Sequence, residues 1–197
     1  MRITEKDFQD AALYLNVDVA AIKAVKEVES GGRGGFLKEG KPIILFEGHI
    51  FWRELKKRGL LPEQFVDGNE DILHPKWSKI HYKGGIQEYE RLEKAKMIHE
   101  EAALASASWG MFQIMGFDFA LCGEKSVREM VDRMTESEAC QLKLFLIFLE
   151  KNKWVNYLRN KDWARFARCY NGPGYAINQY DRKLQMAYEK YSKKSVC

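Results

Sequence analysis

Apolar residues recur every three or four positions along most of the chain, which is the spacing of amphipathic α-helices. This pattern predicts a helix over residues 19–29, begun by Asp18, and a longer helix over residues 86–105. A further helix is expected to begin at Asp162 and to end at the sequence NGPG, because proline and glycine do not continue a helix. Helices therefore dominate the expected fold.

The segment CQLKLFLIFLEKN, which begins at Cys140, is apolar on nearly all sides and predicts a central helix enclosed by the rest of the protein. Thr135 and Glu138 have the spacing of a capping box, in which each side chain bonds the backbone N–H of the other residue. We expect this pair to begin the central helix.

The pattern changes between residues 31 and 82, where glycines interrupt it and residues 60–82 have no regular period. The run PIILF has the β-branched, apolar composition of a strand. We therefore expect an α+β fold that is mainly α-helical, with a small strand-and-loop lobe over residues 31–82. The length of 197 residues and the hydrophobic content of 46% suit a single domain over residues 1–197.

Composition and charge exclude several classes of protein. The formal net charge of +4 is small, and basic residues alternate with acidic ones, so no nucleic-acid-binding surface is expected. The N-terminal segment MRITEKDFQDAALYLN lacks the apolar centre of a secretion signal. No apolar run approaches the roughly 20 residues that cross a bilayer, so no stable membrane association is expected.

The cysteines and histidines do not form the patterns of a metal site. Four cysteines (Cys122, Cys140, Cys169 and Cys197) are widely spaced without a CxxC pair, and we expect reduced thiols. The four histidines lack paired short spacings, and no glycine-rich nucleotide motif is present. No metal or cofactor is expected.

The first predicted helix places two glutamates differently. On a helical wheel Glu29 lies about 20° from Ile22, between Ile22 and Val25 on the apolar side. Glu27 lies about 140° from Ile22, on the side of Lys23. We therefore expect Glu27 to be solvated and Glu29 to face apolar surroundings.

A carboxyl group in apolar surroundings has a raised pKa, because burial disfavours its charged form. The negative end of the helix dipole raises the pKa further, since Glu29 falls in the last turn. Such a group suits a general acid that holds a proton near neutral pH, as glycoside hydrolysis requires. The glycines that follow would let a ligand approach the backbone. The alternative is a structural glutamate that caps or ion-pairs a loop, for instance with Arg33.

Two later stretches carry residues suited to binding sugars. In SASWGMFQIMGFD, Trp109 offers a flat apolar surface and Gln113 can bond sugar hydroxyls, although Trp109 and Phe112 can equally belong to the core. In RCYNGPGYA, Tyr170 and Asn171 end a helix before a rigid turn. The Tyr170 hydroxyl can orient a carboxylate or water, or the side chain can fill the core.

Taken in order, these stretches resemble a known superfamily. A Glu-Ser pair at a helix end, then Gly-Met-Phe-Gln-Ile, then Tyr-Asn-Gly-Pro-Gly, is similar to the lysozyme-like superfamily, which includes goose-type lysozymes and soluble lytic transglycosylases. The stretches VESGGRGGF, PIILFEGHIFW, HPKWS, YKGGIQEYERL, SASWGMFQIMG and CYNGPGYA together resemble the N-acetylmuramidase family of phage endolysins. Those endolysins often carry an added N-terminal wall-binding domain, and none is expected here.

The resemblance implies a lysozyme-like fold and hydrolysis of the β-1,4 bond between N-acetylmuramic acid and N-acetylglucosamine in peptidoglycan. It implies Glu29 as the proton donor and Glu47 as the second carboxylate, with Asp118 as an alternative. Glu47 can instead pair with His49 or Arg33 and hold the cleft together. The substrate-binding residues that it implies are Ser30, His49, Trp109, Gln113, Ile114, Tyr170 and Asn171.

Two other functions remain open at this point. One is a lytic transglycosylase, which uses a single glutamate and leaves a 1,6-anhydro sugar. The other is a glycan-binding or virion structural domain without catalysis. As a lysis protein the chain would act as a monomer on glycan strands of the wall. It would collect in the host cytoplasm and need a separate holin-type partner to reach the wall.

Overall fold

The computed structural model describes residues 2–193, and helices make up most of them. Asn16, in left-handed backbone, separates the first two helices, and other turns divide the later ones. The helices are α1 (Glu5–Leu15), α2 (Val19–Ser30), α3 (Gly48–Lys57), α4 (Gln87–Ala105), α5 (Val127–Glu136), α6 (Glu138–Lys151), α7 (Val155–Arg159), α8 (Trp163–Asn171) and α9 (Tyr180–Lys193). Short 3₁₀ turns are η1 (Pro62–Phe65), η2 (Gly116–Asp118) and η3 (Pro173–Ala176).

Two small antiparallel sheets complete the fold. The strands β1 (Phe36–Lys38) and β2 (Lys41–Pro42) pair with each other. The strand β3 (Ile44–Phe46) pairs with β4 (Ala107–Trp109), which pairs with β5 (Ile114–Met115). The second sheet therefore joins the predicted lobe to a hairpin about 60 residues later in the chain, which the sequence pattern did not predict.

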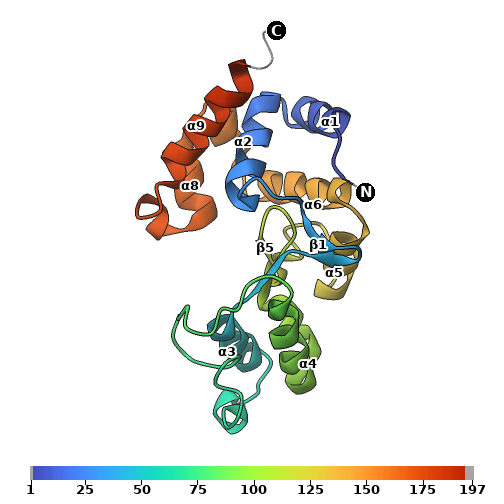
Figure 1. Ribbon diagram of the computed structural model, residues 1–197, viewed down its shortest axis with the longest axis vertical. Coiled ribbons are helices and arrows are strands. Elements are labelled where there is room, and N and C mark those ends of the chain that lie inside the picture. The colour runs from blue at the N-terminus through green and yellow to red at the C-terminus, as the bar shows by residue number, and fades with distance from the viewer. Residues whose placement is uncertain (1, 194–197) are drawn as a thin grey trace.

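The helices form two groups with the small sheets between them. Figure 1 shows α1, α2, α6, α8 and α9 at one end of the molecule and α3 and α4 at the other, with β1 and β5 between the two groups. Helix α2 packs along α9, and α4 packs against α3 and β3. One cluster of buried apolar side chains extends through both groups.

Helix α6 supplies much of this core. Leu144, Phe145 and Leu149 are fully buried, and Phe145 stacks on Phe112 of the β4–β5 turn. Lys143 and Glu150 of α6 are exposed, so the helix is central but not enclosed on every side.

The predicted capping box at the start of α6 is wrong. Ser137 is the N-cap, and its hydroxyl accepts the N–H of Cys140. Thr135 lies in the last turn of α5 and donates to the Asp132 carbonyl. Glu138 is buried and accepts the N–H groups of Ile3 and Gly35, so long-range contacts replace the local cap.

The other predicted helix ends agree with the structure, with one difference. Asp162 accepts the N–H of Arg165 and caps α8, and α8 ends at Asn171, directly before Gly172, as the NGPG turn predicts. Asp18 precedes α2, but its carboxylate makes no cap and instead bonds Lys161 and Tyr188. The prediction of an α+β, mainly helical fold is confirmed.

Within residues 2–193, no helix is both long and apolar enough to cross a membrane. The side chains of Cys122, Cys140 and Cys169 are free thiols, whereas Cys197 lies outside the described residues.

Candidate active site

Glu29 lies in the last turn of α2, on the side that faces the body of the protein. Ile22 and Val25, which flank it on the helical wheel, are completely buried. The helix ends one residue later at Gly31, whose backbone is left-handed, with φ of 59°. Glu29 is thus a partly buried carboxyl group at a helix end.

The pKa of Glu29 is raised to about 7. Burial is the larger cause and raises the pKa, and a hydrogen bond from Asn171 offsets part of this rise. The Asn171 Nδ2 lies 3.0 Å from the Glu29 Oε1, and it reaches that position because α8 ends there. The predicted rise in pKa is confirmed. A carboxyl group with this pKa is partly protonated at neutral pH and can donate a proton to a leaving group.

Arg33 does not pair with Glu29. Its Nε donates to the carbonyl of Ser30, and in the described part of the chain it makes no ion pair with Glu29. Ser30 itself is 5% exposed, and its hydroxyl donates to the Lys26 carbonyl. A substrate cannot reach this hydroxyl without displacing the helix end, so the proposed binding role of Ser30 is not supported.

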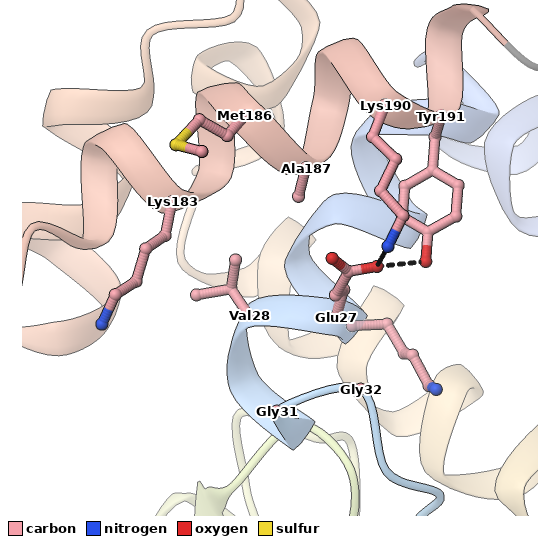
Figure 2. A pocket seen from close by; sticks show the side chains of 10 residues that line it. Glu27, Val28, Gly31, Gly32, Lys183, Met186, Ala187, Lys190 and Tyr191 are labelled. Atoms are coloured by element: carbon pink, nitrogen blue, oxygen red, sulfur yellow. Dashed lines mark hydrogen bonds and ion pairs between the residues drawn. The ribbon is translucent and has the colours of Figure 1, made fainter.

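Glu27 is not simply solvated, contrary to the prediction. Its carboxylate accepts from Lys190 and Tyr191 of α9, so it ties α2 to α9 (Figure 2). These contacts lower the pKa of Glu27, with the hydrogen bond from Lys190 as the largest cause. The two glutamates at this helix end therefore differ: the pKa of Glu29 is raised and the pKa of Glu27 is lowered.

The glycines after α2 are packed against α6 rather than left open. A Cβ atom at Gly35 would collide with the side chain of Gln141, and one at Gly34 would lie 2.6 Å from a Glu138 oxygen. Gln141 also accepts the N–H of Met111. The glycines thus let α6 hold the loop after Glu29 beside the β4–β5 turn.

The β4–β5 hairpin uses its polar groups internally. Gln113 has φ of 50°, accepts from the Ser108 hydroxyl and donates to the Gly110 carbonyl, which stabilises the turn. Trp109 is 2% exposed, and its indole N–H donates to Leu104. Ile114 is buried opposite Trp109 in the sheet. Trp109 and Ile114 are therefore core residues, and the predicted stacking of a sugar on Trp109 is wrong.

Tyr170 belongs to the aromatic core. Its ring stacks on Phe166, and its hydroxyl donates to the Phe112 carbonyl at 2.6 Å. The hydroxyl is thus already engaged and does not orient the Glu29 carboxylate. Among the predicted residues of this end of α8, it is Asn171 that contacts Glu29.

Glu47 follows β3 and stands at the N-terminus of α3. Burial raises its pKa, and a hydrogen bond from the Tyr82 hydroxyl to its Oε2 acts in the opposite direction. The His49 Nδ1 lies 3.4 Å from the same oxygen. Burial, followed by the charges of Arg53 and His74, lowers the pKa of His49, which disfavours a charged imidazole beside Glu47.

A buried ion pair lies behind Glu47, and the sequence analysis did not identify it. Glu88 and Arg91 are completely buried, and the Arg91 Nη1 lies 2.7 Å from the Glu88 Oε2. Glu88 accepts the N–H of Phe46, and Arg91 donates to the carbonyl of Phe46. The pair fixes both backbone groups of the residue before Glu47. The i,i+3 spacing of Glu88 and Arg91 in the sequence QEYERL was the signal from which this ion pair could have been predicted.

Asp118, the alternative second carboxylate, lies in η2. Burial raises its pKa to about 6, and the charge of Lys57 partly offsets this rise. Across residues 2–193, no group of three or more histidine, cysteine and acidic side chains has the arrangement of a metal site.

A mainly helical fold with two small sheets and a carboxyl group of raised pKa at a helix end agrees with a glycoside hydrolase of the lysozyme type, and comparison with known proteins shows that the chain belongs to this class. A model of the N-acetylmuramidase family matches residues 18–192, and the chain belongs to that family. The crystal structure of the endolysin of Burkholderia AP3 phage is similar, with a TM-score of 0.87 and 43% sequence identity. The match covers 98% of this chain and 72% of the endolysin. A search of curated proteins finds no match.

Proposed function

We propose that Glu29 donates the proton to the glycosidic oxygen when this N-acetylmuramidase cleaves the β-1,4 bond between N-acetylmuramic acid and N-acetylglucosamine in peptidoglycan. The observation that carries this proposal is the pKa of about 7, which burial gives to a carboxyl group at a helix end. A general acid with a pKa near the working pH is protonated often enough to act and still acidic enough to transfer its proton.

Asn171 has a defined part in this mechanism. Once Glu29 has given up its proton, the carboxylate is left in apolar surroundings, and the N–H of Asn171 stabilises that charge. Burial therefore keeps the acid protonated before the reaction, and the Asn171 hydrogen bond limits the cost of the anion after it.

We assign the second carboxylate to Glu47, with Asp118 as the alternative. Glu47 is supported by its position at the end of β3 and by the Tyr82 hydrogen bond, which holds one of its oxygens. In lysozyme-type chemistry such a group stabilises positive charge on the sugar or activates water. A Glu47→Gln variant that kept nearly full activity would reduce Glu47 to a structural residue.

Replacing Glu29 by glutamine tests the proposal. The Glu29→Gln variant keeps the shape of the side chain but cannot donate a carboxyl proton, so the rate should fall by about 10²–10⁴-fold. Release of reducing ends from purified peptidoglycan measures this rate. Glu39→Gln, an exposed position in the β1–β2 turn, is the matched control and should retain full activity.

Products of the same digestion separate the alternatives. Free reducing ends support hydrolysis, whereas 1,6-anhydromuramic ends as the main product, seen by mass spectrometry, would establish a lytic transglycosylase. If Glu29→Gln degraded the wall as fast as the parent, Glu29 would not be the acid. A purely glycan-binding domain would release neither product.

We further propose that the protein acts as an endolysin, as the similar Burkholderia AP3 phage protein is described. In that role it would be a monomer that collects in the host cytoplasm and then degrades the wall. A holin-type membrane protein would give it access.

A further inference from the structure

A cavity of about 770 Å³ lies between α2 and α9, and Glu29 is not among the residues that line it. Figure 2 shows Val28 and Ala187 facing each other across it, with Glu27, Lys190 and Tyr191 at one end and Lys183 at the other. Lys26, Gly31 and Gly32 complete its α2 side. Nothing in the catalytic mechanism uses this cavity.

The charges around the cavity favour an anionic ligand. Lys190 lies 2.7 Å from Glu27, so that these two charges compensate each other. Lys26 and Lys183 also line the cavity, and neither makes an ion pair with another residue in the described part of the chain. The Lys183 ammonium lies 5.4 Å from the centre of the Tyr180 ring, and the charge of Lys26 helps to lower the pKa of Glu27, but no carboxylate of the described residues forms an ion pair with either group. Both ammonium groups can therefore bind carboxylates of a ligand.

The remaining lining accepts small apolar groups. Val28 and Ala187 form an apolar floor, and Met186, whose side chain adapts to irregular shapes, is 70% exposed at the edge. A ligand that suits this cavity carries carboxylates on a short chain with methyl-sized side chains. The peptide stems that muramic acid carries in peptidoglycan have this chemistry.

The cavity lies within reach of a sugar bound at Glu29. Gly31 and Gly32 line it and follow Glu29 by two and three residues, so the Gly32 Cα is at most about 11 Å from the Glu29 Cα. A stem of four residues spans about 13 Å when extended. Both glycines have positive φ, and a Cβ atom at Gly32 would meet nothing within 4 Å, so the space around Gly32 at this helix end is unoccupied by other side chains.

We propose that the cavity between α2 and α9 binds the anionic peptide stem of a muramic acid residue next to the scissile bond, with Lys26 and Lys183 holding its carboxylates. This inference rests on the proposed function of Glu29. It makes the enzyme selective for glycan strands that still carry their stems.

The test compares two forms of one substrate. Peptidoglycan is assayed intact and after an amidase has removed its stems, using the wild type and the Lys26→Gln/Lys183→Gln double variant. On intact strands the double variant should show a KM about three- to tenfold higher with kcat unchanged, because exposed ion pairs each contribute modestly. On stripped strands the variant and the wild type should be equal, and the wild type should itself lose affinity.

A matched control keeps the same change in net charge. Lys125→Gln/Lys151→Gln removes two exposed lysines elsewhere and should behave as the wild type on both substrates. As a second measurement, a free stem tetrapeptide should inhibit the wild type on intact strands and inhibit the double variant more weakly. Thermal unfolding of each variant shows that its fold is intact.

Equal losses on intact and stripped strands, or no loss on either, would overturn the inference. Loss of binding to anionic phospholipid vesicles with unchanged cleavage of both substrates would also overturn it, since the cavity would then bind lipid. These outcomes differ from failure of the proposed function, which an active Glu29→Gln variant would reveal whatever the two lysines do.

Discussion

At the scale of single residues, the balance between burial and one hydrogen bond decides the chemistry of Glu29. Apolar surroundings raise the pKa of this carboxyl group, and Asn171 lowers it, with a result of about 7. Activity that depends on the protonated acid should therefore decline as the pH rises through this value.

Removing the hydrogen bond should extend activity to higher pH. In Asn171→Leu the carboxylate loses the donor that stabilises its charge while the site stays dry, so the pKa of Glu29 should rise by about one unit. The basic limb of the pH profile of kcat/KM should move upward by the same amount. Asn156→Leu, at an exposed position, is the control. A basic limb that stays in place or moves downward would show that Asn171 does not tune Glu29.

At the scale of elements, the Glu88–Arg91 pair anchors the end of β3. Arg91 also donates through Nη2 to the Asp71 carbonyl, and Glu88 accepts the N–H groups of Lys83 and Gly84. Helix α4 thereby holds the strand that leads to Glu47 together with two parts of the long loop between α3 and α4. Residues 66–86 of this loop form no helix or strand, so these hydrogen bonds help to attach them to α4.

Breaking the pair should destabilise the protein strongly. Arg91→Met leaves the Glu88 charge buried without its partner, and loss of one member of such a pair typically costs about 3–5 kcal/mol of unfolding free energy. Urea unfolding measures this loss. Arg128→Gln breaks an exposed ion pair with Glu100, in which the side chains are 58% and 43% exposed, and should cost less than about 1 kcal/mol. Similar losses for the two variants would contradict the anchoring role of Arg91.

At the scale of the whole molecule, the surplus of basic residues affects how the enzyme meets its substrate. The formal net charge is +4, and peptidoglycan carries carboxylates along its strands. Opposite charges raise the rate of encounter, and added salt screens this attraction. The attraction is modest because basic and acidic side chains alternate over the surface.

Cell-wall degradation should therefore slow as salt is added. Between about 0.01 M and 0.15 M salt the Debye length falls from about 30 Å to about 8 Å, so the rate on intact walls should decrease over this range. Turbidity of a wall suspension follows the rate, and the melting temperature in the same buffers checks that the fold is unaffected. A rate that is independent of ionic strength would rule out this electrostatic contribution.

Much of this organisation follows from local pattern. The helical period located α2 and α4, Asp162 marked the start of α8, and the position of Glu29 between Ile22 and Val25 anticipated its raised pKa. Each of these features depends on residues within a few positions of one another. For that reason the sequence alone sufficed.

Features that depend on distant residues were missed or misassigned. Glu138 fits a local capping box, but the structure directs it to Ile3 and Gly35. Tryptophan is a residue type on which sugars often stack, but Trp109 is buried because β4 pairs with β3 and β5. Tyr82 had no local signal at all, because its contact with Glu47 joins residues 35 positions apart.

The sequence by itself determined the helical body, the family and the apolar position of Glu29, because helix period and ordered motifs are local properties of the chain. Only the tertiary structure decided which groups surround the Glu29 carboxyl group. It brought Asn171 to Glu29 across 142 positions and tied Glu27 to α9. It also opened a basic cavity between α2 and α9. The burial of a side chain and the charges near it depend on all the residues packed around it. Those neighbours are determined only when helices that are distant in the sequence pack together.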